Sequence, residues 1–176
     1  MEATCNGMMK KRRSVRSYTG EPIADEKLEL VLQAGLLAPS GRRIQPWEFI
    51  VVRDRATLSS MAECREGAAK MLAGADCAVV VLADSEKTDV WVEDCSIAMA
   101  FMHLAADSLG LGSCWIQGRL RNAPDGRSTE DYLRELLGFP EKYRLEAILS
   151  LGMTDSHPEA RNENELLWEK IHREKF

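Results

Sequence analysis

A basic cluster near the N-terminus carries the clearest chemical potential in this sequence. The segment 10–16 reads Lys-Lys-Arg-Arg-Ser-Val-Arg and places five positive charges in an otherwise acidic chain. An arginine guanidinium can meet two phosphate oxygens at once, and a serine hydroxyl adds a further donor. Arg12, Arg13, Ser14 and Arg16 therefore suit a phosphate group. A solvated, charged turn explains the same spacing equally well.

A second candidate is the polar segment 38–47, Ala-Pro-Ser-Gly-Arg-Arg-Ile-Gln-Pro-Trp, which two prolines stiffen. Binding residues collect on loops that rigid elements hold in place. The segment also carries two more arginines, Arg42 and Arg43. An ordinary connection between a helix and a strand is the alternative interpretation.

The third candidate, segment 109–118, reads Leu-Gly-Leu-Gly-Ser-Cys-Trp-Ile-Gln-Gly. It is not a dinucleotide fingerprint, because Trp115 occupies the position of the last glycine in Gly-x-Gly-x-x-Gly and the glycines follow a helix. Cys114 has no base nearby in the sequence, so core packing is favoured over a nucleophilic role.

Composition excludes several other classes of function. The net charge of −5 and the pI of about 5.3 argue against binding a nucleic-acid backbone. Five cysteines without a Cys-x-x-Cys pair, and three widely spaced histidines, predict neither a disulfide framework nor a metal site. The apolar runs are shorter than the roughly 20 residues that span a bilayer. No signal-like stretch follows the N-terminus, so we expect a cytoplasmic protein with a small-molecule substrate, and neither nucleic acid nor membrane as a partner.

The elements that must position these residues follow from periodicity and turn signals. Apolar spacing predicts helices over 25–37, 56–65 and 130–137, and apolar, β-rich runs predict strands over 47–53, 77–82, 113–117 and 146–151. The 77–82 run has no polar residue and should lie at the centre of the sheet. A crossover between the first two strands would suit a mixed or parallel sheet. With no linker or repeat, the whole chain 1–176 is expected to be a single domain.

The predicted helix over 92–109 suggests a second copy of the chain. Its residues from Ile97 to Ala106 are almost all small or apolar, so its whole circumference should be buried. A chain of 176 residues does not readily cover such a helix by itself, which indicates packing against a partner subunit. The charged C-terminal tail, predicted to be helical, also carries Leu167, Trp168 and Ile171, which need a surface to pack on.

Together these motifs resemble the FMN-dependent nitroreductases. The resemblance rests on Arg-Arg-Ser-Val-Arg, on Ala-Pro-Ser-Gly-x-x-x-Gln-Pro-Trp after the first long helix, on Gly-Leu-Gly-Ser-Cys-Trp-Ile after the central helix, and on the closing Glu-Lys-Ile-His-x-Glu-Lys-Phe. Their order and spacing both match, from about Arg12 to Phe176. The family implies an α+β, three-layer fold with a central mixed sheet flanked by helices, built as an intertwined homodimer.

The resemblance also implies a role for each motif. Arg12, Arg13, Ser14 and Arg16 would hold the FMN phosphate and ribityl chain, and Arg161 would join them. Pro39, Ser40 and Gly41 would reach the flavin from the second subunit, with Arg43 and Gln45 in the same loop. Trp115, Ile116, Gln117 and Gly118 would lie along the isoalloxazine ring, with a backbone N–H near Gln117 pointing at flavin N5.

The implied activity is the transfer of hydride from NAD(P)H to FMN and on to an organic acceptor such as a nitroaromatic, a quinone or a flavin. The absence of a triad, metal motif or paired carboxylates agrees with this, because the cofactor carries the chemistry. Arg43 stands where the family usually has an asparagine, and Gln117 where a glycine or acidic residue is common. Two alternatives stay open: a flavin-binding module without turnover, and a specialised member that consumes flavin, dehalogenates or dehydrogenates.

Overall fold

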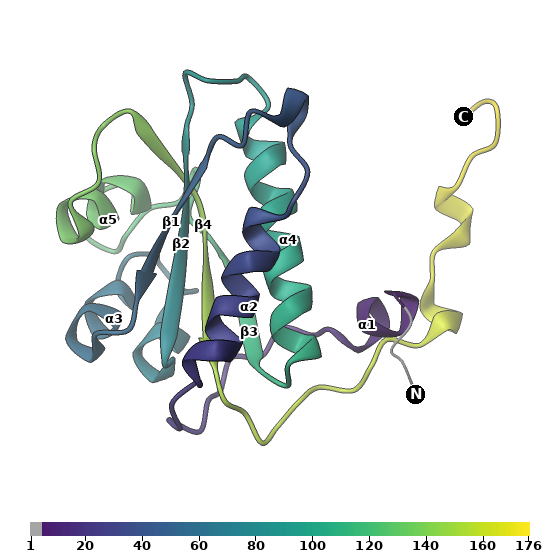
Figure 1. Cartoon of the computed structure of the whole chain (residues 1–176), viewed down its shortest axis with the longest axis horizontal. Helices are drawn as coiled ribbons and strands as arrows, with labels where there is room; N and C mark the ends of the chain where they lie inside the picture. The colour runs from purple at the N-terminus through teal and green to yellow at the C-terminus, as the bar shows by residue number, and fades with distance from the viewer. Residues whose placement is uncertain (1–4) are drawn as a thin grey trace.

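A central antiparallel sheet organises the protein, whose computed structural model describes residues 5–176 (Figure 1). Its strands are β1 (Trp47–Val52), β2 (Cys77–Asp84), β3 (Gly112–Gln117) and β4 (Tyr143–Gly152), in the order β1-β2-β4-β3. The α+β class is confirmed. The expectation of a mixed sheet is wrong for the described residues, because every pair of neighbouring strands is antiparallel.

The connection between β1 and β2 explains this difference. Val52 pairs with Ala78, so the chain leaves and re-enters the sheet at the same end. The residues just outside this pair are tied together, since Arg53 Nη2 donates to Asp76 Oδ2 at 2.9 Å. The intervening segment, with α3 (Arg55–Met61) and a 3-10 helix (Lys70–Gly74), is therefore a long hairpin loop instead of a crossover.

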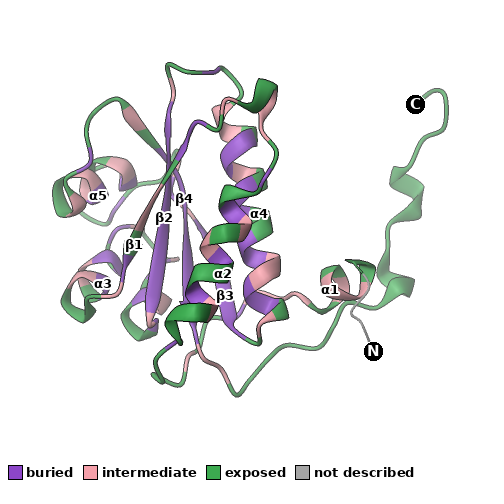
Figure 2. Cartoon of the chain, in the orientation of Figure 1, coloured by how far each residue is buried: buried purple, intermediate pink, exposed green. Residues whose placement is uncertain are grey.

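Helices cover both faces of the sheet and make three layers (Figure 1). One face is covered by α2 (Asp25–Leu36) and α4 (Trp91–Ser108), and the other by α3 and α5 (Thr129–Leu137). Strand β2 is central as predicted, and all of its residues are buried (Figure 2). Its side chains alternate between the two cores: Val79 and Val81 face α4, whereas Val80 and Leu82 face α3 and α5.

The central helix α4 is buried on only part of its circumference within one chain. Met99, Met102 and Ala106 face the core, while Ile97 and Phe101 are 37% and 41% exposed. The expectation of burial on all sides is thus not met by a single chain. The helix ends as its glycines predict: Gly110 adopts a φ of +75°, and the N–H of Leu111 donates to the carbonyl of Ala106.

The segment after β4 runs outward from the body of the protein (Figure 1). It contains two short 3-10 helices, Glu163–Glu165 and Trp168–Lys170, in place of the predicted helical tail. Every residue from 155 onward is exposed (Figure 2), including Leu166, Leu167, Trp168, Ile171 and Phe176. Apolar side chains on an extended arm have no core of their own to enter.

Residues 5–176 contain neither a membrane-spanning helix nor a cluster of metal ligands. None of the helices in residues 5–176 combines the length and apolar character that a membrane crossing requires. Within the same residues, no three His, Cys, Asp or Glu side chains gather in a way that could hold a metal ion.

Candidate functional site

The N-terminal basic segment lies against the start of β3. After the short helix α1 (Cys5–Lys11), the chain passes along this strand, and the N–H of Val15 donates to the carbonyl of Ser113 at 2.9 Å. The side chain of Val15 is buried. Residues 12–24 form neither a helix nor a strand, and contacts such as this one hold the segment in place. The first and third sequence motifs are thus brought together.

A hydrogen-bonded chain of side chains joins the same two segments through α4. Arg12 Nη1 lies 2.9 Å from His103 Nε2, and His103 Nδ1 lies 2.5 Å from Ser113 Oγ. A guanidinium can only donate, so Nε2 must be the acceptor and the proton of the neutral ring belongs on Nδ1. Burial, and then the charge of Arg12, lower the pKa of His103 to about 4. His103 is therefore neutral at pH 7 and orients Arg12 without adding charge.

Positive charges from the N-terminal segment and from the C-terminal tail meet at Arg12. Burial lowers the pKa of Arg12, and the neighbouring charge of Arg161 is the next cause, with a smaller contribution from Arg13. The N–H of Arg161 donates to the carbonyl of Lys10, which ties the outgoing tail to α1. Among the ion pairs of the described residues, none joins Arg12, Arg13, Arg16 or Arg161 to a carboxylate. Such a cluster is suited to an anion.

A surface hollow of about 260 Å³ opens beside this cluster. It brings the basic segment, the exposed side of α4 and strand β3 to one place, and its lining comprises Met9, Arg12, Ala100, His103, Leu104 and Trp115. The hollow therefore combines one cationic side chain with apolar and aromatic surface. That combination fits a ligand with an anionic end and a flat apolar body.

The end of β3 is held by a polar network. Trp115 Nε1 donates to Gln117 Oε1 at 2.9 Å, and Gln117 Nε2 donates to the carbonyl of Glu146 at 3.2 Å. Glu146 is buried, its Oε2 has no partner, and burial raises the pKa of its carboxyl. Gly118 leaves no room for a side chain, because a Cβ there would lie 2.5 Å from Leu145 Cδ2.

The loop after α2 has an unusual backbone. Arg42, Arg43 and Gln45 all adopt positive φ angles, of 52°, 59° and 50°. Non-glycine residues rarely take this conformation, and loops that hold several such residues are often ligand-binding segments. Ser40 Oγ accepts from the N–H of Gln45 at 3.0 Å, and Asp94 of α4 accepts from the N–H of Gly41 at 2.8 Å.

Comparison with known proteins decides the family. The model of the nitroreductase family matches residues 9–64 and 59–153. The chain belongs to the nitroreductase family. An Archaeoglobus fulgidus protein whose name includes "NADH dehydrogenase/NAD(P)H nitroreductase" is 40% identical over 177 residues, covering 98% of each chain.

Solved structures agree with this assignment and confirm the nitroreductase-like fold. An FMN-dependent nitroreductase from Clostridium difficile R20291 superposes with a TM-score of 0.94 at 45% identity, covering 97% of this chain and 99% of the other. A nitroreductase from Desulfovibrio desulfuricans in complex with FMN has a TM-score of 0.79 at 28% identity, over 100% and 99% of the two chains.

Within one chain, this nitroreductase-family protein brings together only part of the predicted site. Gly41 contacts Asp94, whereas Arg12 contacts His103, nine residues further along α4. At 1.5 Å per residue these two contacts are about 13 Å apart along the helix. The loop carrying Pro39, Ser40, Gly41, Arg43 and Gln45 and the arginine cluster therefore belong to opposite ends of α4. The loop has its own hollow, of about 340 Å³, lined in part by Ser40, Arg43 and Gln45.

Ile116 differs from its neighbours on β3. Its side chain is buried in the core on the α3 and α5 side, so it can offer a ligand only its backbone. Cys114 is also buried, and burial raises the pKa of its thiol, which agrees with a packing role.

Sequence reasoning missed three polar residues of this region, namely His103, Asp94 and Glu146. All three are buried. A histidine and an aspartate inside the apolar α4, and a glutamate inside an apolar strand, are the signals that could have identified them. Buried polar groups are normally hydrogen-bonded, as His103 is to Arg12 and Asp94 is to Gly41.

Proposed function

We propose that this nitroreductase-family protein is an FMN-dependent oxidoreductase that takes hydride from NAD(P)H and reduces an organic acceptor such as a nitroaromatic, a quinone or a flavin. When bound, FMN supplies the redox chemistry by accepting hydride from the reductant and passing electrons to the acceptor. The protein supplies binding, orientation and electrostatics. The names of the A. fulgidus and C. difficile proteins support this assignment.

The observation that carries the proposal is the convergence of Arg12, Arg13 and Arg161 beside the start of β3. Burial lowers the pKa of Arg12, and the charges of Arg161 and Arg13 lower it further while Asp107 opposes them. A phosphate dianion would offset that mutual repulsion, and the neutral His103 already fixes the direction of the Arg12 guanidinium. Arg16 and Ser14 extend the same segment. These residues therefore fit the phosphate and ribityl chain of FMN.

Strand β3 offers its free edge to the flavin ring. The carbonyl of Ser113 bonds to Val15, outside the sheet, while the N–H of Gly118 bonds to Glu146 of β4. Backbone groups alternate in direction along a strand, so those of Trp115 and Gln117 face the same free edge as those of Ser113. The backbone N–H of Gln117 is thus oriented to donate to a ring nitrogen lying along this edge, and its side chain is held back by Trp115 and Glu146.

The second half of the site comes from a partner subunit in this proposal. The loop over Pro39, Ser40 and Gly41 is too far along α4 to meet the arginine cluster of its own chain. A homodimer formed over the exposed Ile97 and Phe101 face of α4 brings the partner's loop to the flavin. The apolar side chains of the tail would pack on the partner in the same assembly.

The test is turnover by the FMN-loaded protein. NADH or NADPH oxidation is followed with and without menadione as a quinone and nitrofurazone as a nitroaromatic acceptor. The proposal requires oxidation that depends on both bound FMN and acceptor. Tight FMN binding without oxidation of either reductant would contradict it and indicate a flavin-binding module. Loss of the flavin itself during turnover would indicate a flavin-consuming member.

A further inference from the structure

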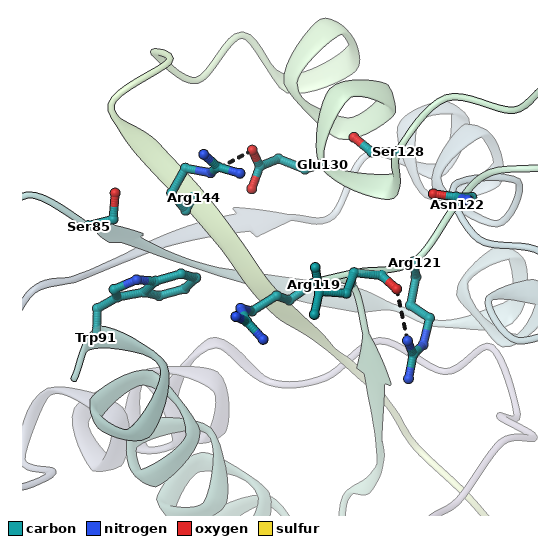
Figure 3. A pocket seen from close by; sticks show the side chains of 10 residues that line it. Ser85, Trp91, Arg119, Arg121, Asn122, Ser128, Glu130 and Arg144 are labelled. Carbon is teal, nitrogen blue, oxygen red and sulfur yellow. Dashed lines mark hydrogen bonds and ion pairs between the residues drawn. The ribbon is translucent and has the colours of Figure 1, made fainter. Parts of the chain in front are cut away.

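A cavity of about 420 Å³ lies at the far end of β3 and adjoins the site described above at Gly118 (Figure 3). It begins at Gly118, which directly follows the strand. Its charged lining consists of Arg119, Arg121 and Arg144 against the single carboxylate of Glu130. In a chain with a net charge of −5, this cavity has a surplus of two positive charges.

The one carboxylate in the cavity is already engaged. Glu130 Oε1 accepts from Arg144 Nε at 2.8 Å and from Arg134 Nη2 at 2.9 Å, and Oε2 accepts from the N–H of Leu145 at 2.7 Å. It therefore cannot also neutralise Arg119 or Arg121. Among the described residues, neither of these two arginines has an ion pair to a carboxylate.

Backbone hydrogen bonds hold the segment that carries Arg119 and Arg121. The N–H of Arg119 donates to the carbonyl of Glu146 and the N–H of Arg121 to that of Gly118, while the carbonyl of Arg121 accepts from the N–H of Thr129. Leu120, between the two arginines, adopts a φ of +56° and is strongly exposed. Figure 3 shows the Arg119 guanidinium turned toward Trp91, whose ring centroid is 5.7 Å from it, with Arg144 and Glu130 on the opposite wall. The backbone that carries the two arginines is therefore held in place at the rim of the cavity.

This second anion site cannot belong to the same phosphate as the first. The Arg12 cluster adjoins Ser113 at the start of β3, and the cavity begins at Gly118, five residues later. At about 3.3 Å per residue the two sites are about 16 Å apart along the strand. FMN has a single phosphate, so an anion bound in this cavity would belong to a different ligand.

We propose that this cavity binds the diphosphate of the nicotinamide dinucleotide while its nicotinamide lies over the flavin. The inference rests on the proposed function, because it takes NAD(P)H as the reductant. The two negative charges of a diphosphate match the two surplus positive charges of the cavity, and the cavity adjoins the end of the strand along which the flavin ring lies. Arginine forks suit the adjacent phosphate oxygens.

The test compares the FMN-loaded double variant Arg119→Gln/Arg121→Gln with wild type and with Arg127→Gln. Arg127 lies on the same loop but pairs with Asp125 and Glu135 outside the cavity, so it controls for loss of charge. The probe is ADP-ribose, which carries the diphosphate without the nicotinamide, and its binding is measured by calorimetry. We expect the double variant to bind ADP-ribose at least about tenfold more weakly, because charge-assisted contacts are lost. The KM for NADH should rise by a similar factor, with kcat and FMN affinity unchanged.

Arg121→Gln alone guards against a folding defect, since the side chain of Arg121 donates to the adjacent carbonyl of Leu120 and so ties no distant segments together. It should also weaken ADP-ribose binding, by about threefold. Unchanged ADP-ribose binding in the double variant would overturn the proposal. A second result would also overturn it: turnover of the double variant that is impaired with para-nitrobenzoate as the acceptor but not with nitrobenzene. That result would assign the two arginines to a carboxylate of the acceptor. If neither NADH nor NADPH reduces the FMN of the wild type, the proposed function fails, and that outcome is observed independently of ADP-ribose binding.

Discussion

Replacing Arg12 should selectively remove the contribution of the FMN phosphate to binding. In Arg12→Gln the guanidinium that His103 orients is lost, while the strand that lines the ring is untouched. A hydrogen bond to a charged group contributes about 1.5–3 kcal/mol. Arg12 is only half-buried, and its removal relieves repulsion on Arg161 and Arg13, so a value of about 2 kcal/mol is appropriate. This corresponds to an increase of about 30-fold in the Kd for FMN.

Riboflavin provides the matched ligand for this experiment, because it has the same ring and ribityl chain without the phosphate. Flavin fluorescence titration of the apoprotein should show the loss for FMN and almost none for riboflavin, and Arg127→Gln should behave as wild type with both. Equal losses for the two flavins would show that Arg12 supports the fold or the ring site instead. An unchanged Kd for FMN would refute the assignment of the phosphate to this cluster.

Three further perturbations test other parts of the account. Gly118→Ala should lower the free energy of unfolding by about 1–3 kcal/mol in a denaturant titration, because the new Cβ would meet the buried side chain of Leu145. A Cβ at Gly74 would meet nothing within 4 Å, so Gly74→Ala should have little effect. Equal losses in the two variants would contradict the packing argument. The lowered pKa of His103, about 4, means that the unfolded chain takes up a proton first as the pH falls, so stability should decline from about pH 6.5 to about pH 4, by roughly 3 kcal/mol. That decline should flatten in His103→Gln, and an unaltered pH profile would exclude His103 as its source. Phe101→Glu should convert a dimer into a monomer in sedimentation experiments, whereas Leu136→Glu, at an exposed apolar residue on the opposite face, should not; a dimer that persists in Phe101→Glu would place the interface elsewhere.

Local patterns predict much of this fold because their causes are local. The unbroken apolar run after Cys77 can only be a fully buried strand, and β2 is indeed at the centre of the sheet. The glycines after α4 mark a left-handed cap, and Gly110 has that conformation. The direction of β1 relative to β2 has no such local signal. The loop that joins them is long enough to permit either arrangement, and in the structure Arg53 meets Asp76 across it.

The candidate site likewise combines features that the sequence reveals with features that depend on the folded structure. The charges near Arg12 and the strand containing Trp115 are visible in the sequence, and the structure brings them together. The positive φ angles at Arg42, Arg43 and Gln45 are set by the surroundings of the loop and leave no mark on residue type. The arginine-lined cavity was equally invisible, because Arg144 lies far from Arg119 in the sequence and joins it only through the pairing of β3 with β4.

The most direct test of the central claim is an anaerobic absorbance spectrum of the FMN-loaded protein before and after addition of NADH, and separately of NADPH. We predict that the absorbance band of the oxidised flavin bleaches with at least one reductant and returns when an acceptor is added. A band that stays unchanged with both reductants would contradict the claim that this nitroreductase-family protein turns over its flavin.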